Sequence, residues 1–215
     1  MKEKTMDTAV REKGKTSTVP VSESINSIPV SKVLFSPKGG ISKELVRLTQ
    51  AAAKEISVAA YAFSSKYLGN ALVKAIKRGV KIRLILDMEN AKKSYSIDEW
   101  LIENGIDVRF IKLKRGSMHH KILIVDGVHL MTGSYNFTND SEFRNHEAVI
   151  FINATTTTGV TTSITSTNAI VKAFTAEFDR LWSIASDPIP KAANFHRCRS
   201  QSAHRRIPRL FGGKG

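Results

Sequence analysis

Four side chains near the middle of the chain have the chemistry of a phosphate site. His119 and Lys121 stand two positions apart, so in a β-strand their side chains share one face, and His120 points to the other. Ser134 and Asn136 have the same spacing. Lysine is a point charge for phosphate, serine and asparagine donate hydrogen bonds, and histidine acts as a nucleophile or proton carrier near neutral pH. These residue types together suit a site that binds phosphate.

A β-hairpin is the element that must position these groups. Two apolar runs, Ile122–Val125 and Val128–Met131, flank the pair Asp126-Gly127. An Asp-Gly pair supplies the positive φ angles that a tight hairpin turn needs. The hairpin therefore brings the imidazole, the ammonium, the hydroxyl and the amide together at its open end.

The spacing of these residues resembles a known motif. The stretch His119-x-Lys121-x4-Asp126-x6-Gly133-Ser134-x-Asn136 is similar to the HKD motif of the phospholipase D superfamily. The further spacing to Glu147, within Asn145-His146-Glu147, resembles that of the small single-motif endonucleases of this superfamily. The resemblance runs from about Val33 to Trp182, and no second motif follows.

The resemblance implies a reaction that uses histidine and neither a metal nor another cofactor. His119 of one subunit attacks phosphorus and forms a phosphohistidine, while His119 of a second subunit protonates the leaving oxygen and then activates water. The residues also favour a homodimer, because one histidine cannot serve both sides of phosphorus at once. Lys121 and Asn136 hold the phosphate, and Ser134 binds it or braces the site. Glu147 accepts a hydrogen bond from His119 and fixes its tautomer.

Two residues of the motif have structural roles by the same reasoning. Asp126 lies at the turn and its pleat parity separates it from His119, so we expect it to stabilise the hairpin. Gly133 belongs to the motif without a reactive group. A zinc site built from His119, His120 and His146 lacks a suitable spacing, so no metal site is predicted.

The charge of the chain points to a polyanionic partner. The 215 residues carry a net charge of +14, with a pI near 10.0. Lys112, Lys114 and Arg115 form a basic loop directly before the motif, where it can hold a substrate chain. We therefore expect DNA, and also RNA, as the partner. The single cysteine, Cys198, excludes an internal disulfide framework.

Strands that alternate with helices predict an α/β fold, an α/β/α sandwich whose central sheet is mixed because the hairpin adds antiparallel strands. We expect a flexible arm over residues 1–28, one phospholipase D-like nuclease domain over 29–186, and a basic tail over 187–215. The Thr- and Ser-rich stretch 153–168 is interpreted as an inserted surface loop or an edge strand pair. Tyr61 and Phe63 are interpreted as core residues rather than base-stacking residues.

Two other functions fit the same residues. A phospholipase or cardiolipin-type phosphodiesterase would use the same motif, with membrane lipid as its partner, although the sequence has no apolar stretch long enough to cross a membrane. A nucleic-acid-binding protein with an inactive site is the third, and the complete set of motif residues argues against it. Without a signal-like segment we expect a cytoplasmic protein, or a periplasmic or secreted one if a signal was removed.

Overall fold

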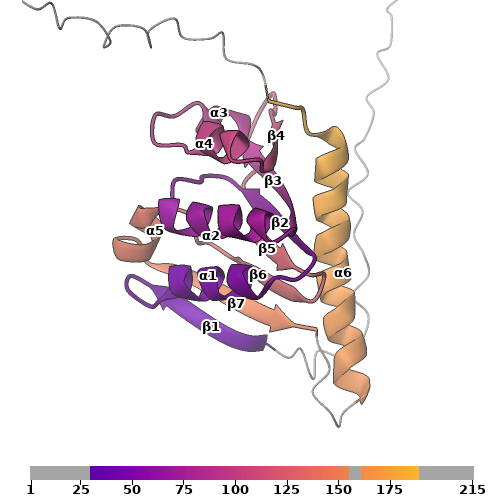
Figure 1. The fold of residues 1–215 in the computed structure, drawn as a ribbon. Helices are drawn as coiled ribbons and strands as arrows, with labels where there is room; N and C mark the ends of the chain where they lie inside the picture. The colour runs from indigo at the N-terminus through magenta and orange to yellow at the C-terminus, as the bar shows by residue number, and fades with distance from the viewer. Residues whose placement is uncertain (1–29, 155–160, 189–215) are drawn as a thin grey trace, which may run out of the picture.

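A computed structural model describes residues 30–154 and 161–188 (Figure 1). Its sheet has the order β1-β7-β6-β5-β2-β3-β4. The strands are β1 (Val30–Ser36), β2 (Glu55–Ala60), β3 (Lys81–Asp87), β4 (Asp107–Ile111), β5 (Lys121–Val125), β6 (His129–Gly133) and β7 (Glu147–Asn153). The helices are α1 (Ile41–Ala51), α2 (Lys66–Lys77), α3 (Met88–Ala91), α4 (Asp98–Glu103), α5 (Asn139–Phe143) and α6 (Thr161–Ile184).

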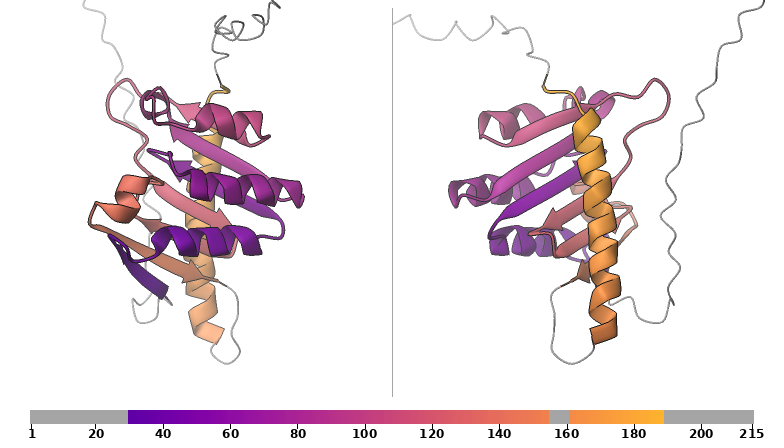
Figure 2. Two further views of the ribbon diagram at one scale, coloured as in Figure 1. Left: turned by 60° about the vertical axis from the view of Figure 1, so that its left-hand side comes forward. Right: turned by 90° about the vertical axis from the view of Figure 1, so that its right-hand side faces the viewer.

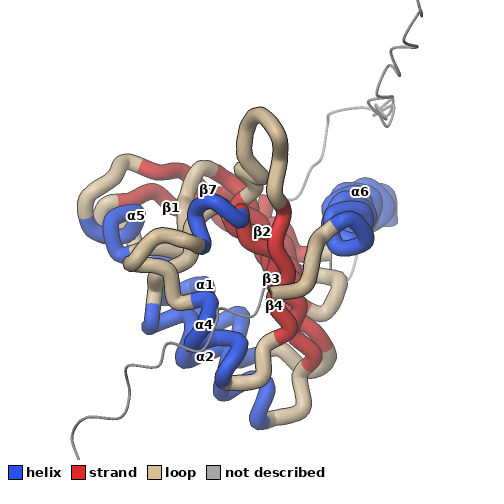
Figure 3. The backbone as a smooth tube through the Cα atoms, turned by 90° about the horizontal axis from the view of Figure 1, so that it is seen from above, coloured by secondary structure: helices blue, strands red, loops and turns tan. Residues whose placement is uncertain are grey.

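The sheet lies between two helical layers. Helices α1, α2 and α4 cover one face, and α6 runs across the other (Figures 1 and 3). Each face has its own apolar cluster, which includes Leu72 and Leu84 on the first face and Ile122 and Phe178 on the second. The predicted α/β/α sandwich is therefore confirmed.

The sheet is mixed, as predicted. Strands β2, β3 and β4 are parallel neighbours and are connected through helices, whereas β5, β6, β7 and β1 pair antiparallel. Helix α2 shows how local sequence sets these elements. The hydroxyl of Ser65 accepts a hydrogen bond from Leu68 N at its start, and Gly79, with φ 92°, follows its end. A capping serine and a left-handed glycine are the usual boundaries of a helix.

The hairpin formed by β5 and β6 is also confirmed. Asp126 and Gly127 have φ angles of 53° and 66°, which suit a two-residue turn of the mirror-image type. The carboxylate of Asp126 accepts hydrogen bonds from three backbone amides before and at the start of β2, Ala53 N, Lys54 N and Glu55 N, at 2.7–2.9 Å. The turn end of the hairpin is thereby fastened to the neighbouring strand.

The open end of the hairpin lies at the sheet edge where β2 and β3 end and β7 begins. Ala60 of β2 pairs with Lys121, Ile122 pairs with Thr132, and the amide of Ser134 donates to Ala148 O at 3.0 Å. We call this edge the site edge. Residues from four strands and the loops that follow them are thus brought together there.

The last helix differs from the prediction. The sequence indicates an inserted loop or an edge strand pair over 153–168, but the backbone is helical from Thr161 (Figure 2). Threonine and serine are only a few tenths of a kcal/mol worse than alanine in a helix, so a helix that packs firmly over its later turns extends through them. Residues 155–160 of the expected insertion lie outside the described residues.

The short helix α3 was not predicted, because four residues carry too little periodicity to detect. The predicted arm over 1–28 and the tail over 187–215 lie outside the described residues, except for Asp187 and Pro188.

Candidate functional site

His119 and Lys121 form the centre of the site edge. The Lys121 ammonium lies 2.9 Å from Nδ1 and 3.1 Å from Nε2 of the His119 imidazole, and it donates to the His119 carbonyl oxygen at 2.8 Å. Lys121 is buried, with 5% of its surface exposed, whereas His119 is exposed. The predicted nucleophile thus faces solvent above a lysine that is held in place.

The surroundings of His119 and Lys121 lower the pKa of both side chains. Partial loss of hydration, followed by the nearby Lys121 ammonium, lowers the pKa of His119, and the Asp87 carboxylate acts in the other direction. Burial lowers the pKa of Lys121 to about 8, against a raising effect of Glu147. At neutral pH the imidazole is therefore mainly unprotonated and the lysine mainly charged, which is the combination that attack on a phosphate requires.

Tyr61 is a member of the site that sequence reasoning assigned to the core. The centroid of its ring lies 4.5 Å from the centroid of the His119 ring. The Lys121 ammonium lies 5.0 Å from the centroid of the Tyr61 ring. Phe63, by contrast, is fully buried. Tyr61 is the first residue beyond β2, and strand parity alone does not reveal that its ring turns toward the imidazole.

His120 lies on the other face of the sheet, as its parity predicts. Its Nε2 is 3.2 Å from Oε1 of Glu177 in α6, and Glu177 also pairs with Arg180. The side chain of His120 is therefore engaged with α6. His146 is exposed and has no recorded contact with the His119–Lys121 pair.

Glu147 has different partners from the one expected. Its carboxylate accepts hydrogen bonds from Ser134 Oγ at 2.6 Å and from Asn145 Nδ2 at 3.1 Å. The expected bond from His119 is not among the hydrogen bonds of the described residues. Glu147 thus braces Ser134, and it acts on the site through its charge, which raises the pKa of Lys121.

Gly133 is required by the close approach of β6 to β7. A Cβ atom at this position would lie 2.1 Å from Ala148 O and 2.8 Å from Val149 Cα, and both are backbone atoms. No side chain can relieve such a clash by rotating. The glycine of the motif therefore permits the strand spacing from which Ser134 reaches Glu147.

Asn136 has hydrogen-bonding capacity to spare. Its backbone carbonyl accepts from Thr138 N at 2.8 Å, but its buried Oδ1 has no hydrogen-bond partner among the described residues. A buried polar atom without a partner is unfavourable by about 1–3 kcal/mol. The Oδ1 atom of Asn136 can therefore accept a further hydrogen bond.

A group of exposed cations borders the site. The loop between β4 and β5 exposes Lys112, Lys114 and Arg115. At the end of this loop, Met118 N donates a hydrogen bond to the Asp87 carboxylate. This loop also lies near α3, because the pKa of Glu89 is lowered mainly by its hydrogen bond from Lys92 and further by the charges of Lys112 and Lys93. We call the set the cationic rim; its members are Lys92, Lys93, Lys112, Lys114 and Arg115.

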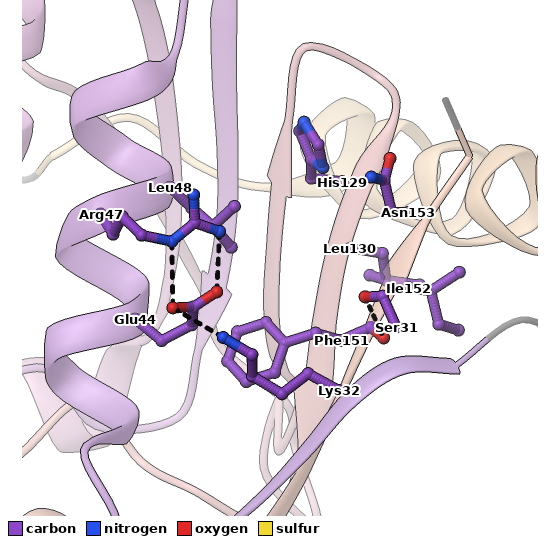
Figure 4. Close-up of a pocket in the computed structure, with 10 residues that line it drawn as sticks. All are labelled: Ser31, Lys32, Glu44, Arg47, Leu48, His129, Leu130, Phe151, Ile152 and Asn153. Atoms are coloured by element: carbon purple, nitrogen blue, oxygen red, sulfur yellow. Dashed lines mark hydrogen bonds and ion pairs between the residues drawn. The ribbon is translucent and has the colours of Figure 1, made fainter. Parts of the chain in front are cut away.

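A cavity of about 240 Å³ lies beside His129, at the end of β6 that is farther from the site edge. Its charged groups pair with one another, because the Glu44 carboxylate forms ion pairs with Arg47 at 2.8 Å and with Lys32 at 3.1 Å (Figure 4). It is one strand length away from His119 and does not contribute to the site. Within residues 30–154 and 161–188, no three His, Cys, Asp or Glu side chains are grouped so as to hold a metal ion.

Comparisons with known proteins place these residues in a family context. The sequence model of the family described as "Cardiolipin synthase, PLD-like domain" matches residues 45–182. Among curated proteins, the chain is 37% identical over 122 residues to a phospholipase D of Rickettsia prowazekii, covering 55% of this chain and 57% of that protein. It is 33% identical over 138 residues to the mitochondrial cardiolipin hydrolase of Xenopus tropicalis, covering 64% of this chain and 59% of that protein.

A solved structure has the same fold over a larger share of its own length. Nuc of Salmonella typhimurium, a phospholipase D family member, superposes with a TM-score of 0.62 at 28% identity, covering 73% of this chain and 96% of Nuc. The curated relatives are matched over less than two thirds of their length. The matched residues 45–182 include every motif residue from His119 to Glu147.

Proposed function

We infer the function of this chain from its family, because it belongs to the phospholipase D superfamily. We propose that it hydrolyses phosphodiesters through a phosphohistidine, without a metal. The observation that carries this proposal is the contact between an exposed, mainly unprotonated His119 and a buried, charged Lys121. Such a pair offers a nucleophile and a phosphate-binding cation within 3 Å of each other.

The proposed reaction needs a second copy of the chain. His119 attacks phosphorus, an Nimidazole–P bond forms and the P–O bond to the leaving group breaks, while the leaving oxygen takes a proton from His119 of the second copy. Water then attacks phosphorus, gives its proton to that second imidazole, and releases the first. Lys121 and the Asn136 side-chain NH2 bind the phosphoryl oxygens, whereas Ser134, whose hydroxyl donates to Glu147, braces the site. The buried Oδ1 of Asn136 can accept a hydrogen bond from a further group.

We propose nucleic acid as the substrate, with DNA first and RNA as a further substrate. The cationic rim supports this, because five exposed basic residues border the edge that carries His119. The net charge of +14 acts in the same direction. Such a rim can contact several successive phosphates of one chain. These contacts increase the affinity for a long polyanion far more than the affinity for a single lipid headgroup.

Lipid is the second candidate, and the names of the relatives favour it. They are a phospholipase D and a mitochondrial cardiolipin hydrolase. Phe35 and Phe143 are also exposed near the site edge, where apolar side chains can enter a lipid surface. Among the described residues, no helix is long and apolar enough to span a membrane.

One experiment separates these functions. Plasmid and single-stranded DNA are incubated in excess EDTA with the wild type or with His119→Ala, and the same pair is tested on cardiolipin and phosphatidylcholine vesicles. We expect DNA cleavage that survives EDTA and is lost in the variant. Cleavage of lipid alone would favour the lipid function. Salt-sensitive DNA binding without cleavage of either substrate would indicate a binding protein.

A further inference from the structure

A cavity of about 270 Å³ opens beside Asn136, on the helical face that bears α1 and α2. The first turns of α1 and α2 and the short helix α5 supply its walls. The residues that line it include Tyr67, Phe143, Tyr135, Glu142 and Thr138. It is distinct from the ion-paired cavity beside His129.

The cavity lies close to the reacting groups. Tyr135 and Thr138 are one and two residues from Asn136, so their Cα atoms lie within about 8 Å of the Asn136 Cα. Thr138 N also donates to Asn136 O at 2.8 Å, which keeps this short path folded. Phe137 N donates to Ala62 O at 3.2 Å, and the neighbouring Tyr61 contacts the His119 ring. A base on the nucleotide next to a phosphate at His119 is therefore within reach of the cavity.

Two aromatic rings at the cavity are exposed although aromatic side chains are usually well buried. Tyr67 is 55% exposed and Phe143 is 58% exposed. Nucleobases stack on such rings whatever their sequence, and each stacked base contributes about 1–3 kcal/mol. Two rings at one cavity are suited to a flat aromatic ligand.

The polar groups of the cavity suit a base better than a phosphate. Glu142 is buried, and its Oε2 accepts hydrogen bonds from Ser42 N at 2.9 Å and from Tyr135 Oη at 3.0 Å. Burial and the Glu142 carboxylate raise the pKa of Tyr135, so its phenol keeps the proton that it donates. A carboxylate repels phosphate but accepts hydrogen bonds from the N–H groups of bases, such as the ring N3–H of thymine or an exocyclic amino group.

We propose that this cavity binds an unpaired nucleobase next to the scissile phosphate, so that the chain favours single-stranded nucleic acid. The proposal rests on the nuclease function proposed above. A base within a duplex is stacked and paired, and must leave the stack before it can enter such a cavity. The preference for single strands would thus arise from the cavity, while the cationic rim binds either form.

The test compares an oligothymidylate with an oligonucleotide of the same length made of abasic units, which has the same phosphates and no bases. We expect the wild type to have a kcat/KM about five- to a hundredfold higher on the oligothymidylate, the range that base stacking supplies. Tyr67→Ala and Phe143→Ala should lose most of that ratio. Tyr67→Phe, which keeps the ring, should retain it.

Three controls make the result decisive. Phe143→Leu keeps apolar bulk without the ring, Ile184→Ala removes an exposed apolar side chain at the end of α6, and thermal melting of each variant reports folding. Equal losses on both oligonucleotides, or a wild type that cleaves both equally, would overturn the base site and leave the nuclease intact. A wild type that cleaves no nucleic acid would overturn the nuclease function and the base site together.

Discussion

Oδ2 of Asp87 accepts a hydrogen bond from the backbone N–H of Met118 at 3.0 Å, one residue before His119. The other carboxylate oxygen accepts from Asn90 N at 3.0 Å, and the side chain is buried. Asp87 therefore ties the end of β3 to the segment that carries the predicted nucleophile. Its charge also acts on His119, whose pKa it raises against burial and Lys121. We regard Asp87 as a positioning residue.

Asp87→Asn is expected to change both the rate and its pH dependence. Without the carboxylate charge the pKa of His119 falls further, so the acid limb of the kcat/KM profile should move to lower pH. The groups that remain around the imidazole are Lys121 and His120. The amide has a single acceptor oxygen for two N–H donors, so kcat should fall by about tenfold.

The pH profile is measured on bis(4-nitrophenyl) phosphate, with Asp107→Asn as a control at an exposed carboxylate of β4. A lower kcat with an unmoved acid limb would mean that Asp87 serves only to hold the fold.

On bis(4-nitrophenyl) phosphate, whose nitrophenolate leaves without needing a proton from the second His119, Lys121 should define the alkaline limb of activity. Its pKa of about 8 means that the ammonium loses its proton as pH rises through that value, and the phosphate then loses its cation. Lys121→Arg should be less active at pH 7, because a planar guanidinium does not fit the place of an ammonium. It should also show no alkaline fall near pH 8, since arginine stays charged. An alkaline limb of the same position in the arginine variant would contradict this assignment.

Glu147→Gln distinguishes two roles for the glutamate. Its carboxylate raises the pKa of Lys121, so removing the charge should move the alkaline limb to lower pH. Glutamine can still bond Ser134, which preserves the local structure. If Glu147 oriented His119 instead, the acid limb would move. The pH profile of this variant therefore tests the sequence-based expectation directly.

Lys121→Met should be inactive yet more stable than the wild type at pH 7. Burial depresses the folded-state pKa of Lys121, so the unfolded chain binds the proton more tightly and the charged lysine opposes folding. The gain is on the order of 1–3 kcal/mol. It should shrink as pH rises from about 8 toward 10.5, where the wild-type lysine is neutral in the folded state. Urea unfolding at pH 7 and pH 10 measures the difference, and a gain that grows with pH would contradict it.

Gly133→Ala should destabilise the fold by roughly 2–4 kcal/mol, because the new methyl group meets the backbone of β7. Gly79→Ala is the matched control. Its φ of 92° is also unfavourable for alanine, but nothing lies within 4 Å of its Cβ position, so a loss of about 1 kcal/mol is expected. Equal losses in the two variants would show that strand contact does not determine the role of Gly133.

The sequence predicts the sheet well because its strands alternate with helices and are closed by glycine and proline. The hairpin around Asp126 follows from a two-residue turn with a known backbone preference. The beginning of α6 was placed too late, because helix extension through residues of low propensity depends on packing elsewhere in the helix. Local pattern carries no information about that packing.

Spacing selects the candidate residues of the motif, but it does not predict their contacts. Glu147 bonds Ser134 rather than His119, and Tyr61 turns toward the imidazole from the end of β2. Asp87 was not singled out, since one aspartate at the end of a strand has no distinctive pattern. These contacts depend on how neighbouring strands align, which residue spacing within one hairpin does not specify.

The turn at Asp126 gives the motif spacing a physical meaning. Three amides just before and at the start of β2 hold one end of β5, and the site edge holds the other. Five residue steps separate Lys121 from Asp126, or roughly 17 Å of strand. Inserting one residue into β5 would turn Lys121 to the α6 face, whereas inserting two would restore its face but displace it by roughly 7 Å. The number of residues in this strand therefore matters to the site as much as the residue identities at its two ends.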